Sequence, residues 1–482
     1  MDSKLITSSS GEKDSFILAR NSQGLEVRAG VLRLTRYLVV FEVYNPYSIL
    51  QLSEVLSDFK IVINDRITYS GRAVISNVVN TGIMLICEAT LDDSWLDIDL
   101  FTSVTTPNRL RDEFAQFVQE WRKIERILPT FKAAVADLQT MLMDLRRWLE
   151  QVELGIRSEP GGDRAAIERQ VIAELEEPIL PTVGSWFSRF DDISEKVDEE
   201  LRPVHRAFAK RLLHPLVLCS PFVYRTFHKP LGYAGDYEMV NMILRDPYEG
   251  ASLFAKIVNV CFLKNPPAEA HRNRIKYLVN KISEETRRVH ALGRRIKIFN
   301  LGCGPAREIQ NFMRQDDLSD RAIFTLLDFN DETIEHASDL LLKMRNSNRR
   351  LTELNFYKKS VHQILKEAAR PGPEMMPGTY DLVYCAGLFD YMSDRICKRL
   401  MNIFYDLLAP GGLLIATNVD ASKPFRHSME FILEWHLICR NRDQFAVLNP
   451  DKAPPGQFRV EHEQTGVNVF IEVRKPAKPA HA

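Results

Sequence analysis

Hydrophobic and polar positions recur with different periods along the chain, and each period predicts a different kind of element. From about residue 16 to residue 96, short β-branched and aromatic runs alternate with polar turns, which predicts a small antiparallel barrel or sandwich. Between residues 108 and 155 the apolar residues return at helical spacing, which predicts one long amphipathic helix or two helices broken at Pro129. From Arg164 to Arg295 the pattern remains mainly helical.

The remaining sequence alternates short buried runs with helical patterns, as is typical of an α/β domain with a parallel sheet. The successive runs are Ile298–Leu301, Ala322–Leu327, Tyr380–Tyr391 and Leu413–Asn418, with a helical pattern from Arg395 to Leu408. The stretch Phe458–Val473, with its Gln464-Thr-Gly466 turn, predicts an antiparallel hairpin at one edge of the sheet. The sequence therefore predicts a multi-domain protein in which a small β-barrel and helices precede an α/β domain.

Two glycines follow the first buried run of this α/β region. Gly302 and Gly304 lack side chains, so backbone amides in their turn can approach a ligand closely. The next run delivers Asp328, followed by Phe329, at its carboxyl end, where a carboxylate can accept hydrogen bonds from both hydroxyls of a ribose. This combination predicts a ligand that contains adenosine.

The residues around the turn help to choose between adenosine cofactors. Arg307 stands where a dinucleotide fingerprint has its third glycine, which disfavours NAD and hydride chemistry. The turn also lacks the Gly-Lys-Ser/Thr ending of a phosphate loop, so a triphosphate has neither its lysine nor its magnesium hydroxyl. S-adenosyl-L-methionine (SAM) has no phosphate to cradle and fits better. A lone Gly-x-Gly is weak, however, and also occurs in ordinary strand-to-helix turns.

The order of the later elements strengthens this choice. A buried strand ends at Gly387, a helix follows, and Ala409-Pro-Gly-Gly412 leads directly into the next core strand. This order resembles the class I SAM-dependent methyltransferases, which implies a Rossmann-like domain with a seven-stranded sheet. The resemblance implies cofactor binding by Asn300, Gly302, Gly304, Asp328, Phe329 and Gly387. One departure is Asn300, because such enzymes usually carry an acid there, and Asn can bond the cofactor's amino group only without charge assistance.

Composition and charge narrow the function classes. The 482 residues are 45% hydrophobic and 26% charged, as in a soluble globular protein of about two to four domains. A net charge of -1 and a pI near 6.9 give no electrostatic footprint for nucleic acid or an anionic membrane. The seven cysteines include no Cys-x-x-Cys pair and no close histidine partner, so we expect reduced thiols and no metal site. Neither a signal pattern nor a membrane-spanning run is present, so the expected location is cytoplasmic.

The N-terminal pattern resembles a PilZ-type domain, which implies binding of the bacterial second messenger cyclic di-GMP. The resemblance rests on Arg33 and Arg36 and on the segment Asn77-Val-Val-Asn-Thr-Gly82. It is partial, because the arginines are three apart instead of four and Val79 takes the place of a serine, so two expected contacts are altered. A protein-interaction or structural role, with the ligand lost, therefore stays open.

The helical regions leave several alternatives open. The apolar stripe between residues 108 and 155 must be buried either against a neighbouring domain or in a homodimer. Ser158–Asp163 is the clearest linker. Tyr224–Tyr237 predicts an irregular loop, either lining a pocket or simply packing its tyrosines. His271-Arg-Asn-Arg274 is equally typical of a solvated helix start. Helices ahead of such a sheet commonly form a lid that excludes water.

Four strings, taken as a set, resemble a narrower family. They are His228–Asn241, Tyr384–Tyr391, Met429–Ile438 with Arg440, and Thr465–Phe470. They look like bacterial methyltransferases labelled as biosynthesis proteins for the extracellular factor 3-hydroxypalmitic acid methyl ester, a quorum signal. The resemblance covers roughly Arg164 to Pro476. It implies methyl-ester formation on a hydroxy fatty acid or a similar small molecule. Relatives fuse the enzyme to various sensory domains, and the PilZ-like start fits such a fusion.

The implied chemistry is in-line attack of a carboxylate on the methyl group of SAM. An acid of ordinary pKa is already ionised at pH 7, so no general base is required. An arginine or histidine can orient the carboxylate, and aromatic walls favour the sulfonium. We expect catalytic roles for His228, Tyr233, Asp390, Tyr391 and Arg426 and substrate binding by Arg225, Tyr237 and His427. If the acceptor were an amine or a hydroxyl, His228 or Asp390 would have to take a proton. Arg426 could equally be an exposed cation.

The prediction is a cytoplasmic, bacterial, SAM-dependent methyltransferase with four parts. These are a PilZ-like β-barrel (1–105), a helical connector (106–160), a helical lid and substrate region (161–290) and a class I methyltransferase domain (291–482). The expected partners are a small-molecule carboxylate acceptor and, at the N-terminal domain, cyclic di-GMP or a protein. The alternative is a cyclic di-GMP-responsive or scaffold signalling protein whose methyltransferase domain binds SAM without turnover.

Overall fold

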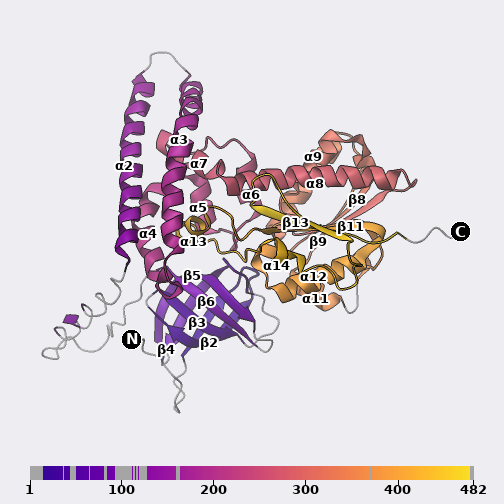
Figure 1. The fold of residues 1–482 in the computed structure, drawn as a ribbon, viewed down its shortest axis with the longest axis horizontal. Coiled ribbons are helices and arrows are strands. Elements are labelled where there is room, and N and C mark those ends of the chain that lie inside the picture. The colour runs from indigo at the N-terminus through magenta and orange to yellow at the C-terminus, as the bar shows by residue number, and fades with distance from the viewer. Residues whose placement is uncertain are drawn as a thin grey trace, which may run out of the picture. The chain divides into compact units, whose positions relative to one another are not determined.

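A computed structural model gives the fold of the chain (Figure 1). It describes residues 15–35, 37–43, 50–63, 66–80, 84–92, 127–158, 163–368 and 372–477, together with residues 111, 114, 115 and 118. The chain forms two compact units, and each is assembled from separate stretches of sequence. The first unit comprises Met1–Ala234, Tyr248–Phe262 and Phe425–His436, and the second comprises Gly235–Pro247, Leu263–Pro424 and Leu437–Ala482.

The first unit contains a closed antiparallel β-barrel, with strand order β1-β2-β3-β6-β5-β4. Its strands are β1 (Ser15–Arg20), β2 (Glu26–Leu34), β3 (Leu38–Val43), β4 (Val55–Ile63), β5 (Arg66–Asn80) and β6 (Leu85–Leu91). Alternate side chains fill the interior: Phe41 and Phe59 are fully buried, with their ring centroids 6.4 Å apart. The sequence pattern allowed a barrel or a sandwich, and the structure shows the barrel.

The other elements of the first unit are helical. They are α2 (Pro129–Ser158), α3 (Arg164–Glu195), η1 (Glu199–Leu201), α4 (Arg202–Val217), α5 (Pro221–His228), α7 (Leu253–Leu263) and α13 (Arg426–Ile432). α2 and α3 pack side by side as a helical hairpin (Figure 1). Pro129 begins α2, and most of the predicted helix before it lies outside the described residues.

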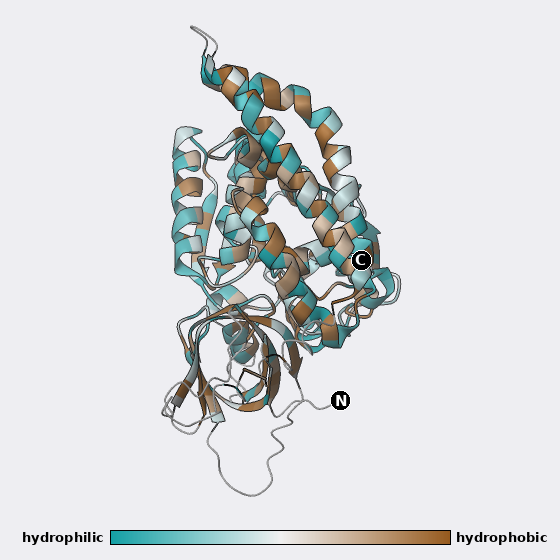
Figure 2. Ribbon diagram, turned by 90° about the vertical axis from the view of Figure 1, so that its left-hand side faces the viewer, coloured by the Kyte–Doolittle hydropathy of each residue, from teal (hydrophilic) through white to brown (hydrophobic). Residues whose placement is uncertain are grey.

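The apolar stripe of α2 is covered within the chain. Phe131, Leu138 and Leu149 are fully buried, and Figure 2 shows apolar residues interleaved with polar ones along the two long helices. These residues are therefore buried without a second copy of the chain, in line with packing against neighbouring elements. A homodimer stays a prediction.

The second unit is built on a seven-stranded sheet with the order β12-β13-β11-β10-β7-β8-β9. Its strands are β7 (Ile296–Leu301), β8 (Ala322–Asp328), β9 (Glu353–Lys358), β10 (Tyr380–Cys385), β11 (Leu408–Val419), β12 (Phe458–His462) and β13 (Asn468–Arg474). Strands β7 to β11 pair in parallel, whereas β13 pairs antiparallel with β11 and β12. The predicted hairpin is thereby confirmed, with Gly466 in its turn at φ 74°.

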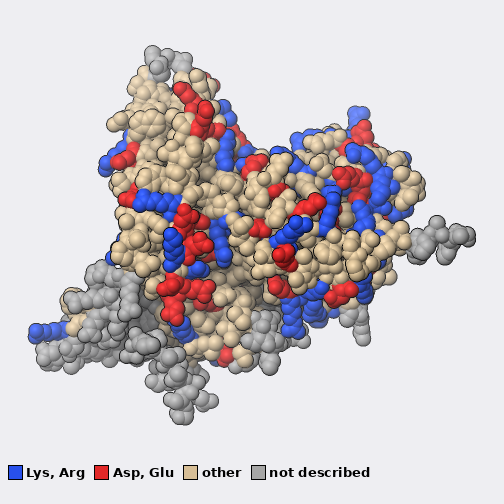
Figure 3. All heavy atoms as spheres, in the orientation of Figure 1, with Lys and Arg blue, Asp and Glu red and all other residues tan. Residues whose placement is uncertain are grey.

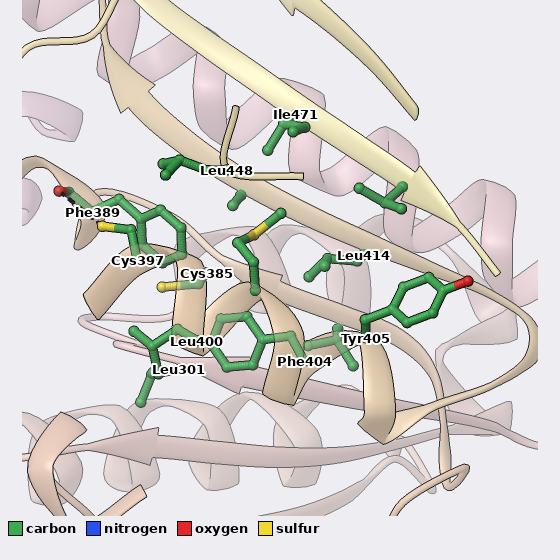
Figure 4. Packing of buried hydrophobic residues seen from close by; sticks show 14 of the residues in the cluster. Leu301, Cys385, Phe389, Cys397, Leu400, Phe404, Tyr405, Leu414, Leu448 and Ile471 are labelled. Carbon is green, nitrogen blue, oxygen red and sulfur yellow. Dashed lines mark hydrogen bonds between the residues drawn. The ribbon is translucent and has the colours of Figure 1, made fainter. Parts of the chain in front are cut away.

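Helices cover both faces of this sheet. They are α6 (Tyr237–Leu244), α8 (Pro266–His290), α9 (Arg307–Gln315), α10 (Asp331–Ser347), α11 (Val361–Glu367), α12 (Asp394–Leu407) and α14 (Arg442–Ala446), with short turns η2 (Asp317–Arg321), η3 (Pro373–Met375) and η4 (Phe389–Tyr391). Along β10, Val383 and Cys385 belong to one core, whereas Leu382 and Tyr384 belong to the other. Figure 4 shows the first core, with Phe404 of α12 packed beneath the strands. Burial on both faces explains why the parallel strands read as nearly continuous apolar runs.

Two segments differ from their sequence predictions. Tyr224–Tyr237 is not one irregular loop, because its first residues form the end of α5 and its last residue begins α6. His271–Arg274 is not a solvated helix start either: α8 begins at Pro266, and Arg274 is buried. The missed signal was the Asn265 cap, whose side chain accepts a hydrogen bond from the Ala268 amide.

The charged surface matches the near-zero net charge. On the face shown in Figure 3, basic and acidic side chains are interspersed. Among the described residues, no helix is both long enough and apolar enough to cross a membrane.

Candidate active site

The strand order of the second unit reverses between β7 and β10: β8 and β9 lie on one side, β11 and β13 on the other. Ligands of open α/β sheets bind outside the carboxyl ends of the strands at such a reversal. Leu301 at the end of β7 pairs with Cys385 at the end of β10, so the segments that follow them start side by side. We call the residues gathered there the switch-point site. Its members are Asn300, Gly302, Gly304, Asp328, Gly387 and Asp390.

The turn after β7 is shaped by glycine and held by the neighbouring strand. Gly302 and Gly304 have φ values of 72° and 51°, in the left-handed region that favours glycine. The amides of Gly302 and Cys303 donate hydrogen bonds to the Leu327 carbonyl at 2.8 and 3.1 Å. A Cβ added at Gly304 would meet no atom within 4 Å. Open space therefore lies beside the backbone where a ligand would approach.

Asp328 ties the end of β8 to this turn. Its Oδ2 accepts a hydrogen bond from the Gly304 amide, and its Oδ1 accepts one from the Asn330 amide, both at 3.2 Å. The side chain is 6% exposed, and burial raises the pKa of Asp328 to about 6 against the effect of these bonds. Each carboxylate oxygen keeps a further lone pair, so the group can still accept from a pair of ribose hydroxyls.

Asn300, at the end of β7, presents an unused acceptor. Its Nδ2 donates to the Tyr384 carbonyl at 3.2 Å, and this bond fixes which way the amide points. Oδ1 is buried and has no hydrogen-bond partner among the described residues. A buried acceptor without a partner is costly, so this oxygen favours a ligand with a donor, such as an ammonium group.

The end of β10 supplies the opposite wall. Gly387 has φ 80°, and its amide donates to Thr417 Oγ1 at 2.9 Å. Asp390, in η4, accepts a hydrogen bond from the Val419 amide at 2.6 Å, and burial raises the pKa of its carboxyl. Through this bond, the backbone of β11 holds the Asp390 carboxyl. Arg440 stabilises the same turn, because its guanidinium donates hydrogen bonds to the carbonyls of Phe389 and Met392.

A comparison with protein families identifies the kind of domain that contains this sheet and site. Residues 293–453 match the family model described as a methyltransferase domain. This part of the chain is therefore a methyltransferase domain. The sequence predicts SAM as the cofactor of this domain. The switch-point site lies within this methyltransferase domain and fits that cofactor: the space over Gly304, the free acceptor of Asn300 and the carboxylate of Asp328 provide complementary groups.

Solved structures show more distant likenesses. A possible exported protein from Bordetella parapertussis is 17% identical, with a TM-score of 0.41 over 53% of this chain and 86% of that chain. Magnesium protoporphyrin IX methyltransferase from Synechocystis PCC 6803, crystallised with bound SAH, is 11% identical, with a TM-score of 0.30 over 44% of this chain and 87% of that one. The methyltransferase domain of bacterial CtHen1-C is 12% identical, with a TM-score of 0.31 over 43% and 100% of the two chains. No curated protein matches the chain.

The remaining predicted residues of the second unit lie at three places. Asp390 and the half-buried Tyr391 follow β10 in the methyltransferase domain. Tyr237 begins α6; its hydroxyl donates to Glu332 at 2.6 Å, and its ring stacks on His336 at 4.2 Å. Phe329 is half-buried directly after Asp328. The roles of these residues stay predictions.

The other predicted residues belong to the first unit. They are Arg225, His228, Tyr233, Arg426 and His427. His228 ends α5 with its imidazole exposed and 4.2 Å from the ring of Tyr224; burial and nearby Arg72 lower its pKa. Arg426 pairs with Glu430 at 2.9 Å. His427 is buried; its Nδ1 has no hydrogen-bond partner among the described residues and lies 3.8 Å from Glu430 Oε2. These five residues and the switch-point site thus belong to different units, and their roles also stay predictions.

Sequence reasoning missed two groups near the end of β10. Thr417 of β11 bonds the Gly387 amide, and Arg274 of α8 lies against the Gly387 backbone. Neither has a motif of its own. The helical spacing of α8 could have shown that Arg274 shares a face with buried Leu278 and Ile282, which lie four and eight residues further on.

Proposed function

We propose that the methyltransferase domain methylates the carboxylate of a hydroxy fatty acid, or of a similar small molecule, to give a methyl ester. The observation that supports cofactor binding is the unused hydrogen-bonding capacity of the switch-point site, above all the buried Oδ1 of Asn300, which has no partner among the described residues. The acceptor class rests on the four strings that resemble methyl-ester-forming enzymes, all of which include residues of the second unit.

Each residue has a part in this proposal. Asp328 holds the ribose hydroxyls, Asn300 accepts from the cofactor's ammonium, and the Gly302–Gly304 turn leaves room for both. When bound, SAM supplies an electrophilic methyl group on a sulfonium. The carboxylate oxygen forms the new C–O bond while the C–S bond breaks and its electrons stay on sulfur. No proton moves, so Asp390 is not needed as a base and can remain bonded to the Val419 amide.

Calorimetric titration with SAM, followed by mass spectrometry of 3-hydroxypalmitate incubated with enzyme and SAM, tests this function. We expect binding in the wild type, formation of the methyl ester, and loss of both in Asp328→Ala. The matched control is Asp317→Ala, which removes a carboxylate that is 95% exposed and should change neither. Binding of SAM without methylation of any carboxylic acid would instead favour the signalling or scaffold alternative.

The regulatory part of the proposal concerns the barrel. Arg33 and Val79, the positions that correspond to PilZ contacts, are exposed on β2 and β5, whereas Arg36 and Gly82 lie outside the described residues. Arg72 of β5 also pairs with Glu434, in the stretch of the first unit that the chain inserts between β11 and β12. We infer that the barrel acts on the methyltransferase domain through this stretch. Titration with cyclic di-GMP, and methylation rates with and without it, test the ligand; an Arg33→Ala variant should lose any response.

A further inference from the structure

Arg274 is a buried cation beside the switch-point site. It lies on α8, is 8% exposed, and sits so close to β10 that a Cβ added at Gly387 would be 2.9 Å from Nη1 and 3.1 Å from Nη2. Its guanidinium therefore lies directly over the backbone that ends β10. A side chain at position 387 would push the guanidinium aside, which gives this glycine a second role besides its φ of 80°.

The guanidinium of Arg274 lacks partners among the residues that the structure describes. Within the ranges that the structure describes, no carboxylate oxygen lies within 4.0 Å of it, and it makes no hydrogen bond. Asp390 and Glu308 are near enough to act on it electrostatically, but each is engaged elsewhere: Asp390 accepts from the Val419 amide, and Glu308 accepts from the Tyr384 hydroxyl at 2.8 Å. A buried charge is normally paired, so a guanidinium with neither an ion pair nor a hydrogen bond to the described residues points to a missing anion.

A second unsatisfied group lies one turn away on the same helix. The Nδ1 of His271, three residues before Arg274, is buried and has no partner among the described residues. Lys423, which follows β11 and is buried, acts electrostatically on both His271 and Asp390. Burial and the neighbouring cations Arg274, Arg272 and Lys423 hold the pKa of His271 well below its ordinary value. The region is therefore electropositive, with donors on two elements.

We propose that Arg274, assisted by His271, binds a carboxylate at the carboxyl end of β10. A planar guanidinium offers two parallel N–H groups that match the two oxygens of a carboxylate. The nearby carboxyls of Asp390 and Glu308 offset part of this positive charge, which suits a singly charged ligand better than a phosphate dianion. Two sources share this chemistry: the methionyl carboxylate of the cofactor and the carboxylate of the acceptor. The second source rests on the proposed function, whereas the first does not.

The variant Arg274→Gln removes the charge and keeps most of the side-chain volume. Its matched control is Lys276→Gln, which removes a cation with a 72% exposed side chain from the same helix. Circular dichroism and thermal unfolding should show that both variants fold like the wild type. Arg274→Lys keeps the charge but loses the two parallel N–H groups of the guanidinium. We therefore expect its ligand affinity to lie between those of Arg274→Gln and the wild type.

The cofactor source is tested by calorimetry with two probes, S-adenosylhomocysteine and 5′-methylthioadenosine, which lacks the amino-acid part. If Arg274 holds the methionyl carboxylate, Arg274→Gln should lower the affinity for S-adenosylhomocysteine by about tenfold to hundredfold, as expected for a lost charge-assisted hydrogen bond. Its affinity for methylthioadenosine should stay unchanged. Equal weakening of both probes would point to general disruption and would count against a carboxylate contact.

The acceptor source is tested by titrating 3-hydroxypalmitate into the complex with S-adenosylhomocysteine, which needs no turnover. If Arg274 holds the acceptor, Arg274→Gln should weaken this acid by about tenfold or more while the affinity for S-adenosylhomocysteine stays constant. The inference is overturned if a folded Arg274→Gln matches the wild type within about twofold for S-adenosylhomocysteine and the acid is either unbound or equally bound. Failure of the wild type to form methyl ester would refute the proposed function alone.

Discussion

Each unit contains a cluster of buried charged and polar groups, and the two clusters are satisfied in opposite ways. In the first unit, Glu434 is fully buried and pairs through Oε2 with Arg72 at 2.8 Å and through Oε1 with Lys210 at 2.5 Å. Lys229 completes the group by donating to the Leu433 carbonyl at 3.0 Å. Although burial acts to raise it, the cations Lys210 and Arg72 hold the pKa of Glu434 well below its ordinary value. These charges satisfy one another.

In the second unit, the polar groups of the switch-point site and its neighbour Arg274 keep hydrogen-bonding or ion-pairing capacity that no described residue uses. Arg274 has no ion pair among the described residues, the Oδ1 of Asn300 has no donor, and Asp328 is ionised against a pKa raised to about 6. Such groups are costly in the free protein. The difference indicates that the first cluster holds a structure together, whereas the second is completed by a ligand. Four changes test this comparison.

The largest expected effect is on the Glu434 cluster. Glu434→Gln removes the fully buried counter-charge of Arg72, Lys210 and Lys229 and leaves only Asp92 beside the first two, so we expect the first unit to lose about 3–5 kcal/mol of unfolding free energy. Differential scanning calorimetry of the full chain should show a transition at clearly lower temperature. Glu461→Gln, at a half-exposed side chain, is the control and should shift nothing. An unchanged thermogram for Glu434→Gln would mean that the cluster is not structural.

The next effect concerns the free acceptor in the second unit. Asn300→Leu removes Oδ1 at nearly constant volume, so S-adenosylhomocysteine should bind about tenfold to hundredfold more weakly, as for a lost hydrogen bond to an ammonium. The control is Asn355→Leu on β9, where an amide also faces a strand carbonyl, at 3.4 Å, but away from the switch point. Equal calorimetric affinities for both variants would contradict the role given to Asn300.

Which of these features could be predicted from the sequence depends on how far apart the residues involved lie along the chain. The barrel, the parallel strands and the final hairpin follow from periods of two and runs of apolar residues, so local pattern was sufficient. That Gly304 and Asp328 lie side by side also follows from the sequence, because Gly304 is in the turn after one of two adjacent parallel strands and Asp328 ends the other. Local sequence pattern predicts these features and no others.

The charge clusters were out of reach for the same reason. Arg72 and Glu434 are 362 positions apart, and nothing in either local sequence points to the other. The string Met429–Ile438 was recognised by resemblance, yet its Glu434 proves to be the centre of an ion cluster. For Arg274, a solvated helix start stayed open as one interpretation of the sequence, because charge alone does not reveal burial.

A smaller effect is the pH dependence of cofactor binding. The folded pKa of Asp328 is raised from 3.8 to about 6, so the free protein takes up a proton as pH falls through that value. Ribose hydroxyls donate to the ionised form, and affinity for S-adenosylhomocysteine should therefore be full above about pH 7 and about tenfold weaker at pH 5. Asp328→Asn should bind more weakly at pH 7 and lose this dependence. A wild-type affinity that stays flat from pH 7 to pH 5 would show that the carboxylate does not contact the ligand.

The smallest change in stability is expected at Arg274, and its sign is the sharpest test of the comparison. Replacing a buried, unpaired cation by an apolar side chain of similar length removes a desolvation cost without breaking a pair, so Arg274→Met should leave the unliganded protein unchanged or more stable by about 1 kcal/mol. Arg72→Met, which breaks the ion pairs to Glu434 and Asp92, should instead lower stability. Calorimetry of the two variants without ligand measures both. Strong destabilisation by Arg274→Met would mean that its charge already has a partner in the folded chain, and the contrast between the two units would disappear.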